Sequence, residues 1–155
     1  MDFVNLFRIE CAHDEDDPPG YGPGYVRLAD HLGAAGIGGT VYELPAGQSI
    51  CPYHYEYGNE EWLVVLSGRP TLRTPAGERE LEPGDVVCFR EGPDGAHKVT
   101  NGADELVRVL MLSTRNKPDI SVYPDSDKIG VYPGNKDDTH LFVRGSAVDY
   151  FEGEL

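Results

Sequence analysis

The sequence has few cysteines, few basic residues and no long hydrophobic run, and each shortage excludes a class of protein. Its cysteines are Cys11, Cys51 and Cys88. They form no Cys-x-x-Cys motif and cannot all pair, which argues against a disulfide scaffold and for a reducing compartment. No apolar run approaches the ~20 residues of a membrane-spanning helix. The N-terminus lacks the basic start and apolar stretch of a secretory signal, so we predict a cytoplasmic protein.

Acidic residues outnumber basic ones, with 27 Asp and Glu against 13 Lys and Arg and a formal net charge of −14. Such a surface repels phosphate backbones and anionic lipid headgroups. We therefore expect no nucleic acid and no membrane as partners, and interpret the acidic surface as a means of keeping a small domain soluble.

Long helices have little room, because 19 glycines and 12 prolines interrupt the 155 residues. Between these breaks lie runs of β-branched, aromatic and other apolar residues. We predict them to be strands at residues 37–44, 51–57, 60–67, 70–74, 85–89, 97–100 and 106–113. Short strands separated by turn signals are typical of an all-β sandwich or barrel.

The two ends of the chain differ in character from this middle region. Residues 12–24 are acidic and then rich in glycine and proline, which predicts a mobile surface loop. Residues 26–35 favour one short helix. The Val-Tyr-Pro triplets at 122–124 and 131–133 indicate short extended pieces laid against the barrel, and residues 141–143 indicate an edge strand.

The stretch 51–68 (CPYHYEYGNEEWLVVLSG) carries the most informative residues. Its Gly-Asn pair at 58–59 predicts a type II′ hairpin turn. That turn would pair Glu56 directly with Glu61 and place His54 on the same face. Facing carboxylates on an inward face are unfavourable unless one takes a proton or a cation lies between them. A divalent metal is the simplest remedy, and hydrated carboxylates at the mouth of the sandwich are the alternative.

Two stretches resemble the two sequence motifs of the cupin superfamily. The first motif runs Gly, about five residues, His-x-His, three or four residues, Glu, six residues, Gly. This chain has Gly47, six residues, His54-x-Glu56, four residues, Glu61, six residues and Gly68. The second motif, Gly-x5-Pro-x-Gly-x2-His-x3-Asn, is matched by Gly84, five residues, Arg90-x-Gly92, four residues, His97, three residues and Asn101.

The resemblance implies a small, single-domain cupin with an all-β fold. Its core would be one cupin-type double-stranded β-helix (jelly-roll) barrel over residues 37–113, within a single domain of residues 1–155. Residues 1–36 would form an N-terminal arm, and residues 114–155 a C-terminal extension packed on the barrel. The resemblance also implies one divalent metal ion, held by His54, Glu56, Glu61 and His97.

The chain departs from the family pattern at several positions. Glu56 replaces the second histidine of the first motif, Arg90 replaces the proline of the second, and two extra residues precede His97. A glutamate adds a harder donor, so Fe, Mn, Ni and Zn all stay open, and Glu56 is either a ligand or a nearby base. A site without metal is the alternative. Neutral imidazoles bind metals, so we expect affinity to fall as they protonate near about pH 6.

We predict that the barrel binds or transforms a small polar molecule with the help of this metal. Oxygenase, isomerase and decarboxylase chemistries all occur on the fold, so no reaction follows from it. A non-catalytic module for a sugar or carboxylate is the second hypothesis, and a barrel that mainly serves assembly is the third.

The outward face of the predicted hairpin is also apolar, which calls for cover. Its members are Tyr53, Tyr55, Tyr57, Trp62, Val64 and Leu66. The N-terminal segment, the C-terminal tail or a second subunit would cover it, and we expect a homodimer.

Several remaining residues are assigned to structure. We expect Cys88 in the core and reject a Cys-x-x-His metal pair at Cys51. Solvent-facing positions are expected for His13, His31 and His140, and Arg73 and Arg108 are interpreted as exposed strand arginines.

Overall fold

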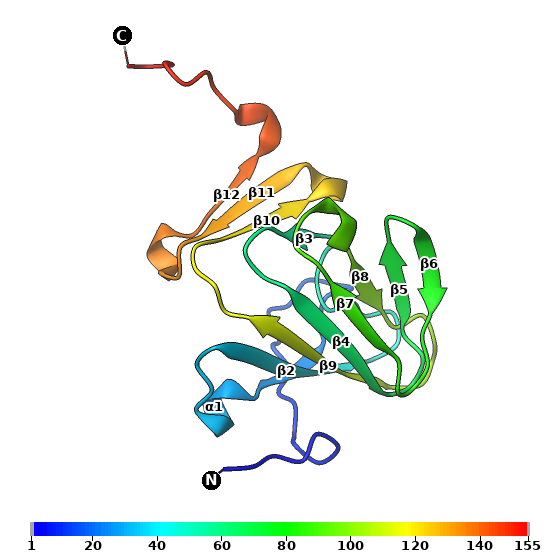
Figure 1. The fold of residues 1–155 in the computed structure, drawn as a ribbon. Coiled ribbons are helices and arrows are strands. Elements are labelled where there is room, and N and C mark those ends of the chain that lie inside the picture. Colours follow the sequence, from blue (N-terminus) through cyan, green and yellow to red (C-terminus); the bar gives the residue numbers. More distant parts are fainter. Residues whose placement is uncertain (1, 155) are drawn as a thin grey trace.

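The computed structural model describes residues 2–154, which fold mainly into antiparallel β-sheets (Figure 1). The largest sheet has the strand order β1-β2-β9-β4-β7. Its strands are β1 (Gly24–Arg27), β2 (Ile37–Leu44), β9 (Val107–Thr114), β4 (Glu61–Ser67) and β7 (Val86–Phe89). The predicted all-β class and barrel-like fold are confirmed, and the helix expected at 26–35 is the short α1 (Ala29–Leu32).

Two smaller sheets complete the body. One has the order β12-β11-β10-β3 and the other β6-β5-β8. Their strands are β3 (Tyr55–Glu56), β5 (Thr71–Thr74), β6 (Gly77–Glu80), β8 (Lys98–Thr100), β10 (Asp119–Tyr123), β11 (Lys128–Tyr132) and β12 (His140–Val143). An isolated bridge from His54 to His97 joins the ends of β3 and β8, and a second bridge joins Ser49, in the loop before β3, to Thr100 of β8.

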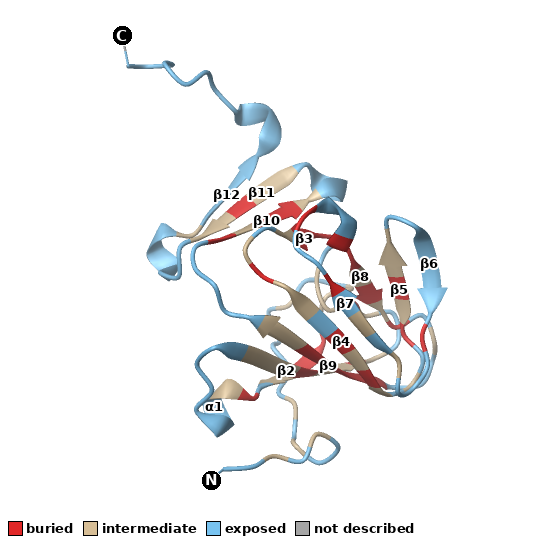
Figure 2. Ribbon diagram, in the orientation of Figure 1, coloured by how far each residue is buried: buried red, intermediate tan, exposed pale blue. Residues whose placement is uncertain are grey.

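The main hydrophobic core lies between the five-stranded sheet and the β6-β5-β8 sheet. Leu63 and Val65 of β4 point inward, whereas Trp62 of the same strand points outward and is 43% exposed. From the opposite sheet, Leu72 and Val99 reach the same cluster. The alternation follows from the two-residue period of a strand, and Figure 2 shows buried residues concentrated on the central strands and scarce in β6 and β12.

The outer face of the five-stranded sheet is partly covered by the N-terminal arm. Val4, Leu6 and Ile9 pack against a cluster that contains Val41 and Leu110. The N-terminal arm therefore covers part of the apolar face that the sequence predicted, as was expected. The C-terminal region supplies another cover, because Val122 and Ile129 pack against Tyr53 and Tyr55.

Arg108 anchors this arm and is not the exposed strand arginine that was expected. It is buried, its Nε donates to the Leu6 carbonyl at 2.8 Å, and its guanidinium also bonds the Ile9 carbonyl and the Glu43 carboxylate. A charged side chain tolerates burial when paired in this way. Arg73, by contrast, lies at the surface in a bidentate ion pair with Asp125.

The predicted hairpin between residues 51–57 and 60–67 is wrong in its pairing. β3 pairs with β10, whereas β4 pairs with β7 and β9. Gly58 lacks the positive φ of a type II′ turn. Instead, its N–H donates to Asp119 Oδ1 at 3.0 Å, and Asn59 Oδ1 accepts from the Asn116 N–H at 2.8 Å. These long-range bonds pull the two strands into different sheets.

Among the other local expectations, some are confirmed and some are wrong. Cys88 is exposed and not in the core, because Val87 and Phe89 take the inward positions of β7. His13, His31 and His140 are exposed as expected. Residues 12–24 are held to the barrel and are not a free loop: Gly22 N–H donates to Gln48 Oε1, and Ala12 bridges Tyr25.

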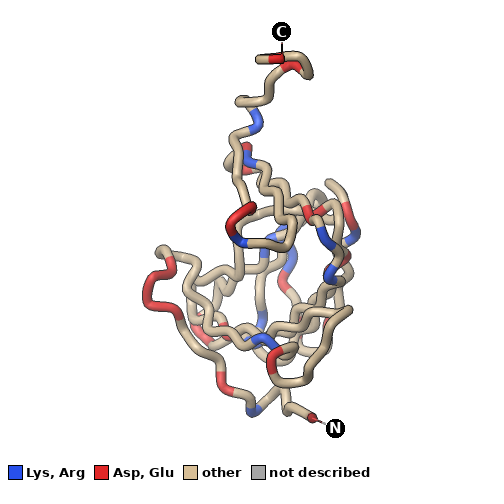
Figure 3. Tube along the Cα trace, turned by 90° about the vertical axis from the view of Figure 1, so that its left-hand side faces the viewer, with Lys and Arg blue, Asp and Glu red and all other residues tan. Residues whose placement is uncertain are grey.

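The charges are distributed unevenly along the chain. Acidic residues occupy loops and turns in many parts of the trace, with fewer basic residues scattered among them (Figure 3).

Within residues 2–154, none of the helices has the length and apolar character needed to cross a bilayer.

Truncating the Arg108 anchor should destabilise the fold. We expect Arg108→Ala to lower the free energy of unfolding by about 3 kcal/mol, because it leaves Glu43 part-buried without its partner and frees the arm. Urea denaturation measures the change. Arg69→Ala, which breaks an exposed pair with Glu80, serves as the control and should cost below about 1 kcal/mol. Equal losses in both variants would contradict the anchoring role.

Candidate metal centre

The centre is built on the bridge between His54 and His97. The His54 N–H donates to the His97 carbonyl at 3.1 Å, and the His97 N–H donates back at 2.8 Å. Residues that exchange hydrogen bonds across an antiparallel pair present their side chains on the same face. The two imidazole centroids accordingly lie 4.7 Å apart, and both residues are buried.

The two extra residues before His97 do not displace it. They are accommodated in a compact loop that contains the 3-10 turn η1 (Pro93–Gly95). Gly95 packs so closely on the Arg90 backbone that a Cβ would lie 1.8 Å from the Arg90 carbonyl oxygen. The Gly92 N–H also donates to the Glu56 carbonyl at 2.7 Å. The loop thus returns the chain directly to the bridge.

Backbone carbonyls orient both imidazoles. His54 Nδ1 lies 3.0 Å from the Pro52 carbonyl oxygen, and His97 Nδ1 lies 3.0 Å from the Gly95 carbonyl oxygen. A carbonyl only accepts, so each Nδ1 carries the proton and each Nε2 keeps a free lone pair. This is the arrangement that supports metal-ligating histidines in proteins.

Glu61, at the start of β4, brings a carboxylate to these nitrogens. Its Oε2 lies 3.4 Å from His97 Nε2 and 3.8 Å from His54 Nε2. One ligand atom from each of the three residues lies within 4.8 Å of the others. Glu61 Oε2 and His97 Nε2 are buried without a hydrogen-bond partner in the described structure, and such orphaned groups are costly unless something binds them.

Aromatic rings hold the histidines in place. Phe89 stacks on His97 with centroids 3.7 Å apart and an angle of 8° between the rings. Tyr123 of β10 stacks on His54 at 5.9 Å. Locked rotamers keep the ligand atoms in a fixed geometry, which favours binding because little conformational freedom is then lost.

Burial sets the protonation of the ligands. It lowers the pKa of His54, and burial together with the neighbouring His54 lowers the pKa of His97 to about 3. Burial, and then Asp119, raises the pKa of Glu61 to about 7. These shifts favour the neutral, metal-binding form of both histidines and the protonated form of Glu61. The expected loss of metal affinity on histidine protonation stays a prediction, and Glu61 is a further group for which a proton and a cation would compete.

Glu56 lies beside this group of three and not within it. Burial, and then the charges of Glu61 and Asp119, raises its pKa to about 8. Its role as a fourth ligand stays a prediction. Asp119 was missed by sequence reasoning, because only the pairing of β10 with β3 brings it here. The same holds for Tyr123.

The donor set fits a divalent metal. Two neutral imidazoles and one carboxylate match the donor set that non-haem iron proteins use, and Mn, Ni or Zn accept the same donors. Three protein ligands leave coordination positions open, which is typical of sites that bind small molecules and not of closed structural sites. Cys51 Sγ lies 3.5 Å from His54 Nδ1, the nitrogen that faces away from this group.

Comparisons with known proteins identify a cupin domain and several similar structures. A family model for the cupin domain matches residues 40–113. The structure is similar to a candidate sugar phosphate isomerase from Acidithiobacillus ferrooxidans (25% identity, TM-score 0.82, covering 92% of this chain and 90% of that one). It is also similar to a sugar phosphate isomerase of the cupin superfamily from Silicibacter pomeroyi (23% identity, TM-score 0.79, 94% of each chain).

A third similar structure shares less of the chain. The polyketide cyclase from Streptomyces resistomycificus covers 74% of this chain and 79% of its own, with 23% identity and a TM-score of 0.59. No curated protein sequence matches the chain. The likeness to the cyclase concerns the fold alone.

Metal analysis should find one divalent ion per chain. We expect His97→Ala to lower metal affinity by at least about 100-fold, because it removes one of three ligands. His140→Ala, at an exposed position of β12, is the matched control and should bind as wild type does. Elemental analysis after dialysis against a weak chelator measures occupancy. Metal retained equally by both variants would refute the site.

The pH dependence of metal binding should follow Glu61. A proton must leave Glu61 before a cation binds, so the dissociation constant should rise as pH falls below about 7, by up to about tenfold per unit. Calorimetric titrations with Zn²⁺ at pH 6 and 8, in buffers of different ionisation enthalpy, count the protons released. An affinity that is flat above pH 6 and falls only below it would instead point to the histidines.

Proposed function

Because the chain is a cupin-domain protein, we propose that it uses one divalent metal to bind and isomerise a small phosphorylated sugar. The observation that carries the proposal is the convergence of Nε2 of His54, Nε2 of His97 and Oε2 of Glu61, with two of these atoms buried and unpartnered. The reaction class is supported by the likeness to the Acidithiobacillus ferrooxidans protein, which extends over both arms of the chain as well as the barrel.

Isomerisation of an aldose to a ketose moves a proton between neighbouring carbons and another between their oxygens. The metal would supply Lewis acidity at those oxygens. Glu56 is suited to the carbon-bound proton, because its pKa of about 8 lies close to neutral pH. Its carboxylate would take the proton from one carbon and return it to the next, so that the sugar changes without net gain or loss of atoms.

The protein also shields this chemistry from water. Phe89 covers His97 and Tyr123 covers His54 with aromatic surface. A dry, preorganised site strengthens each electrostatic contact. Asp119, buried next to Glu56, is a positioning residue in this proposal, since it adds to burial and the charge of Glu61 in raising the Glu56 pKa.

We also retain a homodimer and a cytoplasmic location as parts of the proposal. Ile37 and Trp62 remain 60% and 43% exposed on the outer face of the five-stranded sheet, beyond the reach of the N-terminal arm. Together with Leu112 they line an apolar hollow that a second copy would cover.

Deuterium exchange tests the reaction most sharply. Metal-loaded protein incubated in D₂O with pentose and hexose phosphates should interconvert one aldose–ketose pair and place deuterium on the carbon next to the carbonyl. Glu56→Gln should lower kcat by about 10² to 10⁴-fold while keeping its metal. Glu78→Gln, exposed on β6, is the matched control and should match wild type. If no sugar phosphate in the series shows either deuterium exchange or interconversion, the isomerase proposal is overturned.

A further inference from the structure

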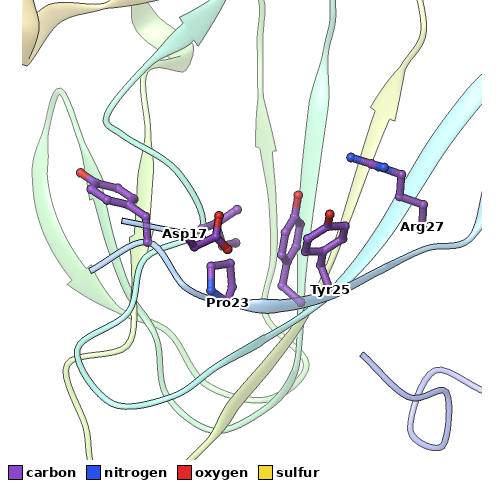
Figure 4. A pocket seen from close by; sticks show the side chains of 7 residues that line it. Asp17, Pro23, Tyr25 and Arg27 are labelled. Carbon is purple, nitrogen blue, oxygen red and sulfur yellow. The ribbon is translucent and has the colours of Figure 1, made fainter. Parts of the chain in front are cut away.

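A polar cavity lies where the N-terminal arm meets the barrel, beside the candidate metal centre. Its volume is about 200 Å³, and its lining includes Asp17, Tyr25, Arg27 and Tyr42 (Figure 4). Nothing in the proposed chemistry of the metal ligands uses these residues.

The cavity is a product of strand pairing. Tyr25 of β1 lies opposite Tyr42 of β2, with ring centroids 6.3 Å apart, and Arg27 follows two positions later on the same face. The Arg27 guanidinium carbon lies 5.2 Å from the Tyr25 ring centroid. Bonds from the barrel hold the other wall, because the Ser49 N–H donates to the Gly20 carbonyl at 2.8 Å.

The two charged side chains that line the cavity, Asp17 and Arg27, form no ion pair among the described residues. On the barrel side, Lys98 Nζ donates to the Tyr21 hydroxyl at 3.3 Å, and Tyr21 also lines the cavity. In a protein with a net charge of −14, an arginine without an acidic partner beside two tyrosines is suited to binding an anion, and a guanidinium binds phosphate through parallel N–H donors.

The cavity adjoins the metal centre. Ile50 lines it and precedes Cys51, whose sulfur lies 3.5 Å from His54 Nδ1. Tyr42 links the two, because it lines the cavity and packs against the core cluster that contains Phe89, the residue that stacks on His97. A ligand with its anionic end at Arg27 would thus extend past Tyr42 toward the metal ligands.

We propose that Arg27, Tyr25 and Tyr42 form a phosphate-binding subsite, contributed largely by the N-terminal arm, that anchors the phosphorylated end of the substrate. This inference rests on the proposed function for the identity of the ligand. Asp17, on the other wall, would accept hydrogen bonds from sugar hydroxyls. The arm would then be part of the binding site as well as a cover for the sheet.

The test titrates inorganic phosphate into Zn²⁺-loaded, full-length protein and follows backbone amide resonances, with NaCl of equal ionic strength as the reference. The amides of Tyr25 and Arg27 should shift saturably with phosphate and not with NaCl. Arg27→Gln should weaken phosphate binding at least tenfold and leave metal affinity unchanged. Arg79→Gln, exposed on β6, should bind phosphate as wild type does.

Two further variants separate the subsite from the metal centre. His97→Ala should lose metal but still bind phosphate at Tyr25 and Arg27, so the subsite can stand even if the metal proposal fails. Tyr25→Phe should weaken phosphate binding several-fold while keeping the strand, which covers the case of a misfolded Arg27 variant. Absence of saturable shifts, or phosphate affinity unchanged in both Arg27→Gln and Tyr25→Phe, would overturn the subsite whatever the metal result.

Discussion

The reciprocal backbone bond between His54 and His97 is the constraint on which the site depends. Two hydrogen bonds of 3.1 and 2.8 Å join the edges of the two smaller sheets at this point. The same contact places two imidazoles side by side, and β4 delivers Glu61 opposite them from the larger sheet. The fold therefore concentrates three donor atoms where its layers meet, and the orphaned atoms there are an energetic cost that a bound cation would offset.

The electrostatics of the centre follow from the same burial. Desolvation favours neutral histidines and protonated carboxylates, and the closeness of Glu56, Glu61 and Asp119 adds repulsion among the acids. A divalent ion would reverse this preference for the carboxylates while leaving the histidines in the form that binds. The three clustered acidic groups repel one another when no cation lies between them, and the same negative charge would make the site selective for a cation.

The structure brings together three of the four residues that the cupin resemblance predicts as ligands, His54, Glu61 and His97, although part of the local reasoning was wrong. The spacing of the motifs predicts this grouping because they encode a three-dimensional arrangement. The local inference failed at Gly58-Asn59, where bonds to Asn116 and Asp119, more than 50 residues away, override the turn preference. Arg108 was misjudged for a similar reason, since its partners Leu6 and Ile9 are distant in sequence. Strand positions were predictable from period and breakers, whereas partners set by tertiary contacts were not.

The most direct test of the central claim is anomalous scattering from crystals grown with a divalent transition metal. The account predicts one anomalous peak per chain, about 2.0–2.3 Å from Nε2 of His54, Nε2 of His97 and an oxygen of Glu61. A single peak bound by other residues, or none at a saturating metal concentration, would contradict it.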